Sequence, residues 1–134
     1  MLKYLVDTDI CIYIMNNRPP EIAEKLTKLP YGSVGMSVIT LGELSAGAEK
    51  SKRRKDALST IELLKNSIEI LDMKTSVANI FGQIKTHLEL KGKIIGVNDL
   101  WIASHAIDLG LTVVTNNTRE FSRVPKLKIV NWAE

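Results

Sequence analysis

Three acidic side chains of this sequence stand where an apolar segment gives way to a new element. Asp7 closes the apolar run at residues 2–6, Glu43 follows a second apolar run, and Asp99 ends a third. A helical pattern follows each of them. Because the functional crevice of a parallel sheet lies at the carboxyl ends of its strands, we expect the three carboxylates to gather there.

Carboxylates that converge on one place repel each other, and this repulsion destabilises the fold unless a cation lies between them. Mg²⁺ is the cation that best suits a site built from oxygen ligands with several retained waters. The spacing of Asp7, Glu43 and Asp99 therefore predicts a metal-dependent enzyme.

Helix capping is the alternative interpretation of the same residues. Asp7 has the residue type of an N-cap. Thr40 and Glu43 have the spacing of a capping box, in which the glutamate reaches back to the first helical turn. Asn98 is another candidate cap, which would leave Asp99 as a first-turn acid favoured by the helix dipole. Capping does not exclude catalysis, because helix N-termini also favour anionic substrates.

Strand-like and helical patterns alternate along the chain. We expect strands at residues 2–6, 34–38, 68–71, 111–115 and 127–130. We expect helices at residues 8–16, 21–28, 41–49, 53–66, 75–90 and 99–109. This alternation predicts an α/β fold, with a central parallel sheet covered by helices on both faces.

Length and composition are those of one globular domain, residues 1–134, that needs no disulfide or structural metal. Cys11 is the sole cysteine and lies in an apolar run, so we expect a buried, inert thiol. The two histidines have no zinc-site spacing. We expect a cytoplasmic protein, since we recognise neither a secretion signal nor a membrane-spanning run.

The formal net charge is +3 and the basic residues are unevenly distributed. They cluster in the segments at residues 50–55, 91–93 and 119–123. A solvated helix connection explains the first cluster by itself. An acidic site ringed by basic segments, however, is what a polyanionic substrate requires.

The order of these motifs resembles that of PIN-domain ribonucleases, specifically the VapC-type toxins of type II toxin–antitoxin systems. The resemblance spans essentially the whole chain. The matching segments are Leu5–Asp9, Ser37–Leu44, Ile95–Ala103, Thr115–Phe121, Val124–Pro125 and Asn131–Trp132.

The resemblance implies a three-layer α/β/α PIN-like domain and Mg²⁺- or Mn²⁺-dependent cleavage of RNA. Asp7, Glu43 and Asp99 match the acidic triad of the family, with Asp7 and Asp99 as metal ligands and Glu43 acting through a water or a second ion. Asn117 takes the place of a fourth acid, and Glu120 either compensates for it or caps a helix.

The resemblance also implies what the protein binds. Structured RNA such as tRNA is the expected substrate, a VapB-type antitoxin is the expected protein partner, and a homodimer is the expected assembly. Arg119, Lys50 and Arg53 are the candidate phosphate contacts. Asp9 is a candidate for an indirect contact near Asp7.

Two other classes of protein remain open on the residues alone. The Asp7 and Asp9 pair suggests a haloacid-dehalogenase-like phosphatase, but Cys11 stands where that family has Thr or Val. The other class is a non-catalytic RNA- or protein-binding module in which the acids only cap helices.

Overall fold

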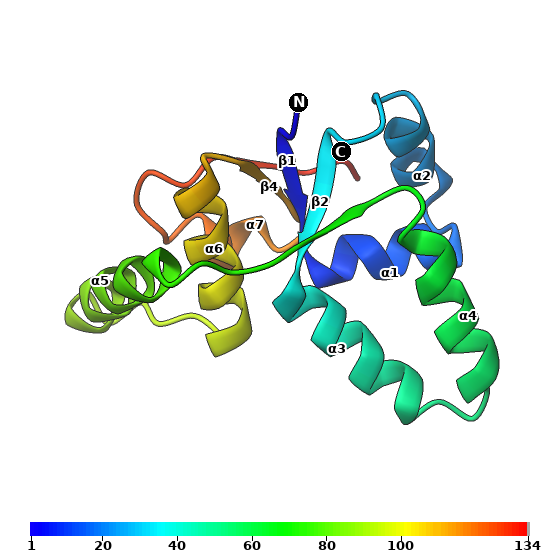
Figure 1. Cartoon of the computed structure of the whole chain (residues 1–134). Coiled ribbons are helices and arrows are strands. Elements are labelled where there is room, and N and C mark those ends of the chain that lie inside the picture. Colours follow the sequence, from blue (N-terminus) through cyan, green and yellow to red (C-terminus); the bar gives the residue numbers. More distant parts are fainter. Residues whose placement is uncertain (134) are drawn as a thin grey trace.

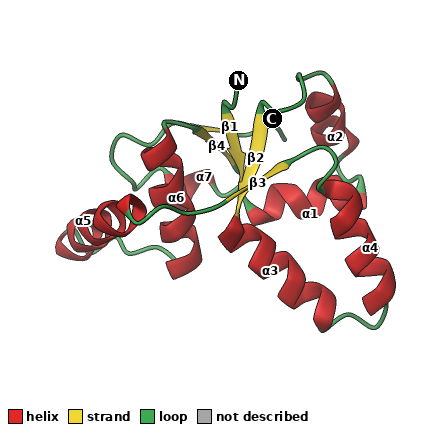
Figure 2. Ribbon diagram, in the orientation of Figure 1, coloured by secondary structure: helices red, strands yellow, loops and turns green. Residues whose placement is uncertain are grey.

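A five-stranded parallel sheet forms the centre of the protein, whose computed structural model describes residues 1–133 (Figures 1 and 2). The order of the strands across the sheet is β3-β2-β1-β4-β5, and every neighbouring pair is parallel. The strands are β1 (Tyr4–Val6), β2 (Val34–Ser37), β3 (Glu69–Leu71), β4 (Thr112–Val114) and β5 (Ile129–Val130).

Helices cover both faces of this sheet, and each face has its own hydrophobic cluster. The first cluster draws on α1 (Thr8–Asn16), α2 (Pro20–Thr27), α3 (Val38–Glu49) and α4 (Arg54–Leu64). The second cluster draws on α5 (Ser76–Leu90), α6 (Val97–Leu109) and α7 (Thr118–Phe121). The three-layer α/β/α fold with a parallel sheet, predicted from the alternating patterns, is therefore confirmed.

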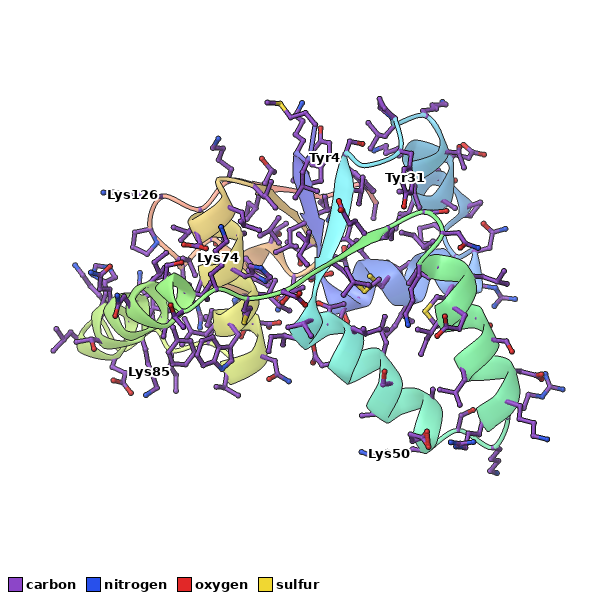
Figure 3. All side chains as sticks on the ribbon, viewed as in Figure 1. Tyr4, Tyr31, Lys50, Lys74, Lys85 and Lys126 are labelled. Atoms are coloured by element: carbon purple, nitrogen blue, oxygen red, sulfur yellow. The ribbon has the colours of Figure 1, made fainter. Side chains whose placement is uncertain are left out.

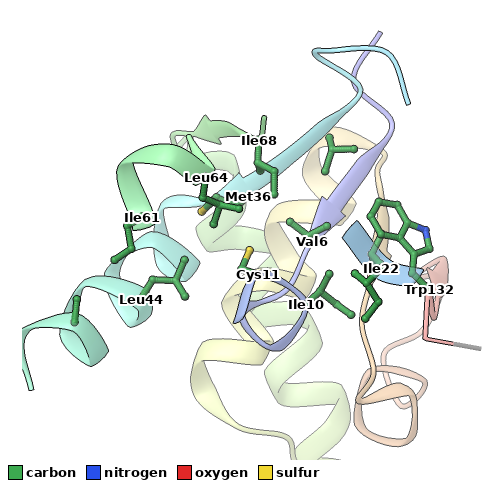
Figure 4. Close-up of a cluster of buried hydrophobic side chains, with 13 residues drawn as sticks. Val6, Ile10, Cys11, Ile22, Met36, Leu44, Ile61, Leu64, Ile68 and Trp132 are labelled. Carbon is green, nitrogen blue, oxygen red and sulfur yellow. The ribbon is translucent and has the colours of Figure 1, made fainter. Parts of the chain in front are cut away.

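The strands separate the two clusters because successive side chains of a strand point to opposite faces. In β1, Leu5 packs into the second cluster and Val6 into the first. In β4, Val113 and Val114 divide in the same way. Cys11 is fully buried in the first cluster (Figure 4), and this burial raises the pKa of its thiol. The expectation of a buried thiol is confirmed.

Two of the predicted helix caps are wrong. Helix α3 begins at Val38, directly after β2, and the Ser37 hydroxyl accepts the Ile39 N–H at 3.1 Å. Thr40 therefore lies inside the helix and does not cap it. Helix α6 begins at Val97, so Asn98 is a helical residue and not its N-cap. The sequence pattern placed both helix starts too late. In α3 the reason is that β2 continues directly into the helix, without a polar connection between them.

The structure adds α7, a short helix that was not expected as a separate element. Within the described residues, no helix has the length and apolar character needed to cross a membrane.

Candidate active site

The carboxyl edge of the sheet brings together the four residues predicted to do chemistry. Asp7 directly follows β1, and Asn117 follows β4 after two residues. Glu43 lies in the second turn of α3, and Asp99 lies in the first turn of α6. The helices α1, α3, α6 and α7 all begin at this edge because each follows a strand or a connection that ends there (Figure 1).

Asp7 is the most buried of these carboxylates, with 3% of its surface exposed. Its Oδ1 accepts the N–H of Ile10 at 3.0 Å, so Asp7 does cap α1 as predicted. Its Oδ2 accepts the hydroxyl of Thr115 at 2.5 Å. Burial raises the pKa of Asp7 to about 6, although both hydrogen bonds oppose the rise. The cap and the buried charge are therefore properties of the same side chain.

Glu43 is held by two other elements of the site. Its Oε1 accepts the hydroxyl of Thr8, at the start of α1, at 2.5 Å. Its Oε2 accepts the amide of Asn98, on α6, at 3.2 Å. Because one donor holds each oxygen, the carboxylate plane of Glu43 is fixed relative to both α1 and α6.

The pKa of Asp99 shows that the acids lie close to one another. Burial raises its pKa to about 7, and the negative charges of Glu120, Asp7, Glu43 and Asp9 add to that rise. Within residues 1–133, no lysine or arginine forms an ion pair with Asp7, Glu43 or Asp99. The predicted convergence of carboxylates without a compensating cation is thus present in the fold.

Glu120 belongs to this site, although the sequence left its role open between compensation and capping. Its Oε1 accepts the N–H of Gly96 at 2.5 Å, and its Oε2 accepts the amide of Asn117 at 2.9 Å. A hydrogen bond with Asp99 also helps to lower the pKa of Glu120, after those two contacts. Glu120 thus holds the start of α6, and its negative charge lies beside the uncharged Asn117. The spacing of three residues between Asn117 and Glu120 was the available signal.

Asn117 and Asp9 have supporting positions. The backbone N–H of Asn117 donates to the Thr115 hydroxyl at 2.8 Å, while its side chain holds Glu120. Asp9 has an exposed side chain on α1, and its charge helps to raise the pKa of both Asp7 and Asp99.

The site is suited to an ion that retains waters. In the described part of the chain, no three His, Cys, Asp or Glu side chains form a ready set of ligands for one ion. Mg²⁺ does not require such a set, because it commonly binds through one or two carboxylates and keeps several waters. The ligand chemistry fits this ion, since Asp7, Asp99, Glu43 and Glu120 offer only oxygen atoms, and the negative charges of the other three help to raise the pKa of Asp99.

The candidate phosphate contacts lie in two places. Arg119 is exposed on α7, next to the site. Lys50 and Arg53 lie at the turn between α3 and α4, at the end of α3 farthest from the sheet (Figure 3). Lys50 follows Glu43 by seven residues, or roughly 10 Å along a helix. The turn that carries Lys50 and Arg53, called here the basic turn, is therefore a surface separate from the site. Its neighbour Arg54 forms an ion pair with Glu49 at 2.6 Å.

Comparisons with known proteins identify the family. The PIN domain family matches residues 4–127. Ribonuclease VapC2 of Rickettsia felis is 41% identical over 96% of this chain and 97% of its own. The tRNA(fMet)-specific endonuclease VapC of Shigella flexneri is 41% identical over 99% of this chain and 100% of its own. The crystal structure of DNA-bound VapBC from Salmonella typhimurium matches with a TM-score of 0.93 and 42% identity, over 98% of this chain and 99% of that one. The chain belongs to the PIN-domain family, among the VapC ribonuclease toxins.

The crowding of the acids makes a prediction about stability. In metal-free protein, Asp99→Asn should raise the melting temperature at pH 8. Asp99 has a pKa of about 7 in the folded protein and an ordinary value of 3.8, so its ionisation costs stability as the pH rises through that interval. The gain should shrink as the pH falls towards 4. Thermal denaturation with EDTA present measures it.

Asp56→Asn is the matched control, because Asp56 is also a first-turn acid, on α4, but is exposed. It should not raise the melting temperature. An Asp99→Asn protein that melts at or below the wild-type temperature at pH 8 would contradict the crowding of charges at this edge.

Proposed function

We propose that this protein is a metal-dependent endoribonuclease toxin that cleaves structured RNA such as tRNA. The observation that carries the proposal is the convergence of Asp7, Glu43 and Asp99 at the carboxyl edge of the sheet, in a chain that belongs to the VapC ribonuclease toxins. Family membership favours this function over the phosphatase and the non-catalytic module that the residues alone left open.

We assign Mg²⁺, or Mn²⁺ in its place, to Asp7 and Asp99. Both carboxylates have a raised pKa, which is the electrostatic condition that a bound cation relieves. When bound, such an ion lowers the pKa of its water and neutralises charge on the scissile phosphate. The hydrogen bonds from Ile10 and Thr115 hold Asp7 in one orientation, so its remaining lone pairs point in fixed directions.

Glu43 is the residue that we assign to the attacking water. Its carboxylate is fixed by Thr8 and Asn98, so it can orient a water and accept its proton without rearranging. Asn117 holds Glu120 in place, and Glu120 in turn holds Gly96 at the start of the helix that carries Asp99. The uncharged Asn117 thus acts on the site through Glu120.

Arg119, Lys50 and Arg53 are proposed to contact RNA phosphates. All three are exposed, and among the described residues none forms an ion pair. The rise along α3 from Glu43 to Lys50 is roughly 10 Å. A folded RNA can place one phosphate at the acids and another at the basic turn over this distance.

The relatives suggest the partners. The Shigella relative is a tRNA(fMet)-specific endonuclease, so an initiator tRNA is the first substrate to test. The Salmonella relative was crystallised as DNA-bound VapBC, which supports a VapB-type antitoxin as partner. We further propose that residues 1–134 act as one PIN domain, as a homodimer, in the cytoplasm.

Asp7→Asn should abolish RNA cleavage and leave the protein folded. The substitution keeps the shape and the acceptor that caps α1, but it removes the charge that we assign to the ion. Cleavage of labelled initiator tRNA with Mg²⁺ measures the activity, and circular dichroism measures the fold. Wild-type rates from this variant, or from wild-type protein in EDTA, would refute the metal-dependent nuclease.

Asn117→Ala should reduce the rate of cleavage by about tenfold, because Glu120 loses one of its two anchoring donors, a contact of the charge-assisted kind. Glu120→Gln should reduce it further, since the charge itself is removed. An unchanged rate for Asn117→Ala would show that this residue is dispensable for the arrangement of the site.

The double variant Lys50→Ala with Arg53→Ala should weaken RNA binding. It should also reduce the dependence of binding on salt, because a protein with fewer phosphate contacts releases fewer counterions when it binds. The rate at saturating RNA should not change. Lys74→Ala with Lys126→Ala is the control, because both lysines are exposed and lie away from the basic turn (Figure 3). Equal losses in both double variants would indicate a nonspecific effect of net charge.

A further inference from the structure

A buried histidine lies behind the proposed active site and has no part in the chemistry described so far. His105 is on α6, on the face that packs against the sheet, with 1% of its surface exposed. Its Nδ1 lies 2.9 Å from the Ser37 hydroxyl, and its Nε2 lies 3.2 Å from the backbone oxygen of Asp72. Both ring nitrogens therefore have a partner outside α6.

The partners determine which nitrogen carries the proton. A carbonyl oxygen only accepts, so Nε2 donates to Asp72. Nδ1 then accepts from the Ser37 hydroxyl, whose oxygen accepts the N–H of Ile39. Burial lowers the pKa of His105, although the Asp72 carbonyl and the charges of Asp108 and Asp72 oppose this effect. The ring is thus neutral at pH 7, and a single chain of hydrogen bonds runs from α3 through it to the end of β3.

This chain joins the elements that position the acids. Ser37 is the N-cap of α3 and precedes Glu43 by six residues. His105 follows Asp99 by six residues on α6. The two helices contact each other, and a second hydrogen bond, from Asn98 to Glu43, connects them at the exposed mouth of the site. The buried bond and the exposed bond together fix the angle between α3 and α6.

We propose that Ser37 and His105 are positioning residues, which set α6 against the start of α3 and thereby set the distance of Asp99 from Glu43 and Asp7. The inference rests on the proposed function. It assigns a role to a side-chain pair that touches neither RNA nor the reacting atoms.

A purely structural role for His105 is the competing explanation, and two substitutions separate it from positioning. His105→Asn places an amide oxygen near the position of Nδ1, so it retains an acceptor for Ser37 and loses Asp72. His105→Gln places an amide nitrogen near the position of Nε2, so it retains a donor for Asp72 and loses Ser37. Each variant loses one buried hydrogen bond, so a merely structural role predicts similar effects of both.

The experiment measures kcat and KM for initiator tRNA, Mn²⁺ affinity by electron paramagnetic resonance, and the melting temperature. His105→Gln should lower kcat by about tenfold to a hundredfold, the effect of misplacing a reacting group by about 1 Å, with little change in KM. It should also weaken Mn²⁺ binding. His105→Asn should keep kcat and Mn²⁺ affinity within about threefold of wild type, because it retains the bond to Ser37.

Ser104→Ala is the matched control. Ser104 is also fully buried on α6, but its hydroxyl donates to Leu100 of the same helix. Its removal should change neither kcat nor Mn²⁺ affinity. If His105→Gln does not fold, Ser37→Ala removes the same bond together with the N-cap contact to Ile39, and it should lose at least as much kcat and Mn²⁺ affinity.

Equal kcat in the Gln and Asn variants, or losses in Ser104→Ala as large as those in His105→Gln, would overturn the positioning role. Failure of the proposed function looks different. Wild-type protein would then bind Mn²⁺ without cleaving RNA, and the Mn²⁺ affinities of the His105 variants would still test the inference.

Discussion

Electrostatic repulsion among carboxylates at the carboxyl edge of the sheet is the constraint on which the rest of the structure depends. Burial raises the pKa of Asp99, and the charges of four neighbouring acids raise it further. A fold selected only for stability has no reason to keep these charges together, because a neutral side chain at any of them would cost less. The protein keeps them, and many of its polar contacts serve to hold them in place.

A neutral donor from another element holds each of three carboxylates, those of Asp7, Glu43 and Glu120. Thr115, directly after β4, holds Asp7, and Thr8 of α1 holds Glu43. Gly96 holds Glu120 from the start of α6. Neutral donors orient an oxygen without cancelling its charge, so the site retains its attraction for a cation. Lysine or arginine in the same places would satisfy the acids and remove that attraction.

The parallel sheet makes this arrangement possible. All five strands end at one edge, so the polypeptide leaves the sheet at the same place each time. Helices α3 and α6 begin at this edge and carry Glu43 and Asp99 in their first two turns. Helix α3 then extends away from the sheet and carries the basic turn at its far end (Figures 1 and 3), so Lys50 and Arg53 lie apart from the acids while Arg119 lies next to them.

The sequence by itself determined the fold class and predicted three acids of the candidate site, Asp7, Glu43 and Asp99. Alternating apolar patterns record which residues must leave water, and Asp7, Glu43 and Asp99 each follow such a pattern. The sequence was less reliable at predicting where a helix begins, because more than one residue had the type of an N-cap. Thr40 and Glu43 have the spacing of a capping box, but β2 continues directly into α3, so Ser37 caps the helix and Glu43 is free to face the site.

Only the tertiary structure decided which side chains hold the acids. Thr8 meets Glu43 across 35 residues, Thr115 meets Asp7 across 108, and His105 meets Ser37 across 68. Hydrogen bonds depend on distance and angle within a few tenths of an ångström, and no periodicity in the chain encodes such a pairing. The sequence determined which residues carry charge and which elements precede them, because residue type and apolar periodicity are both local properties of the chain. Packing decided how those charges are oriented, because their partners come from distant elements.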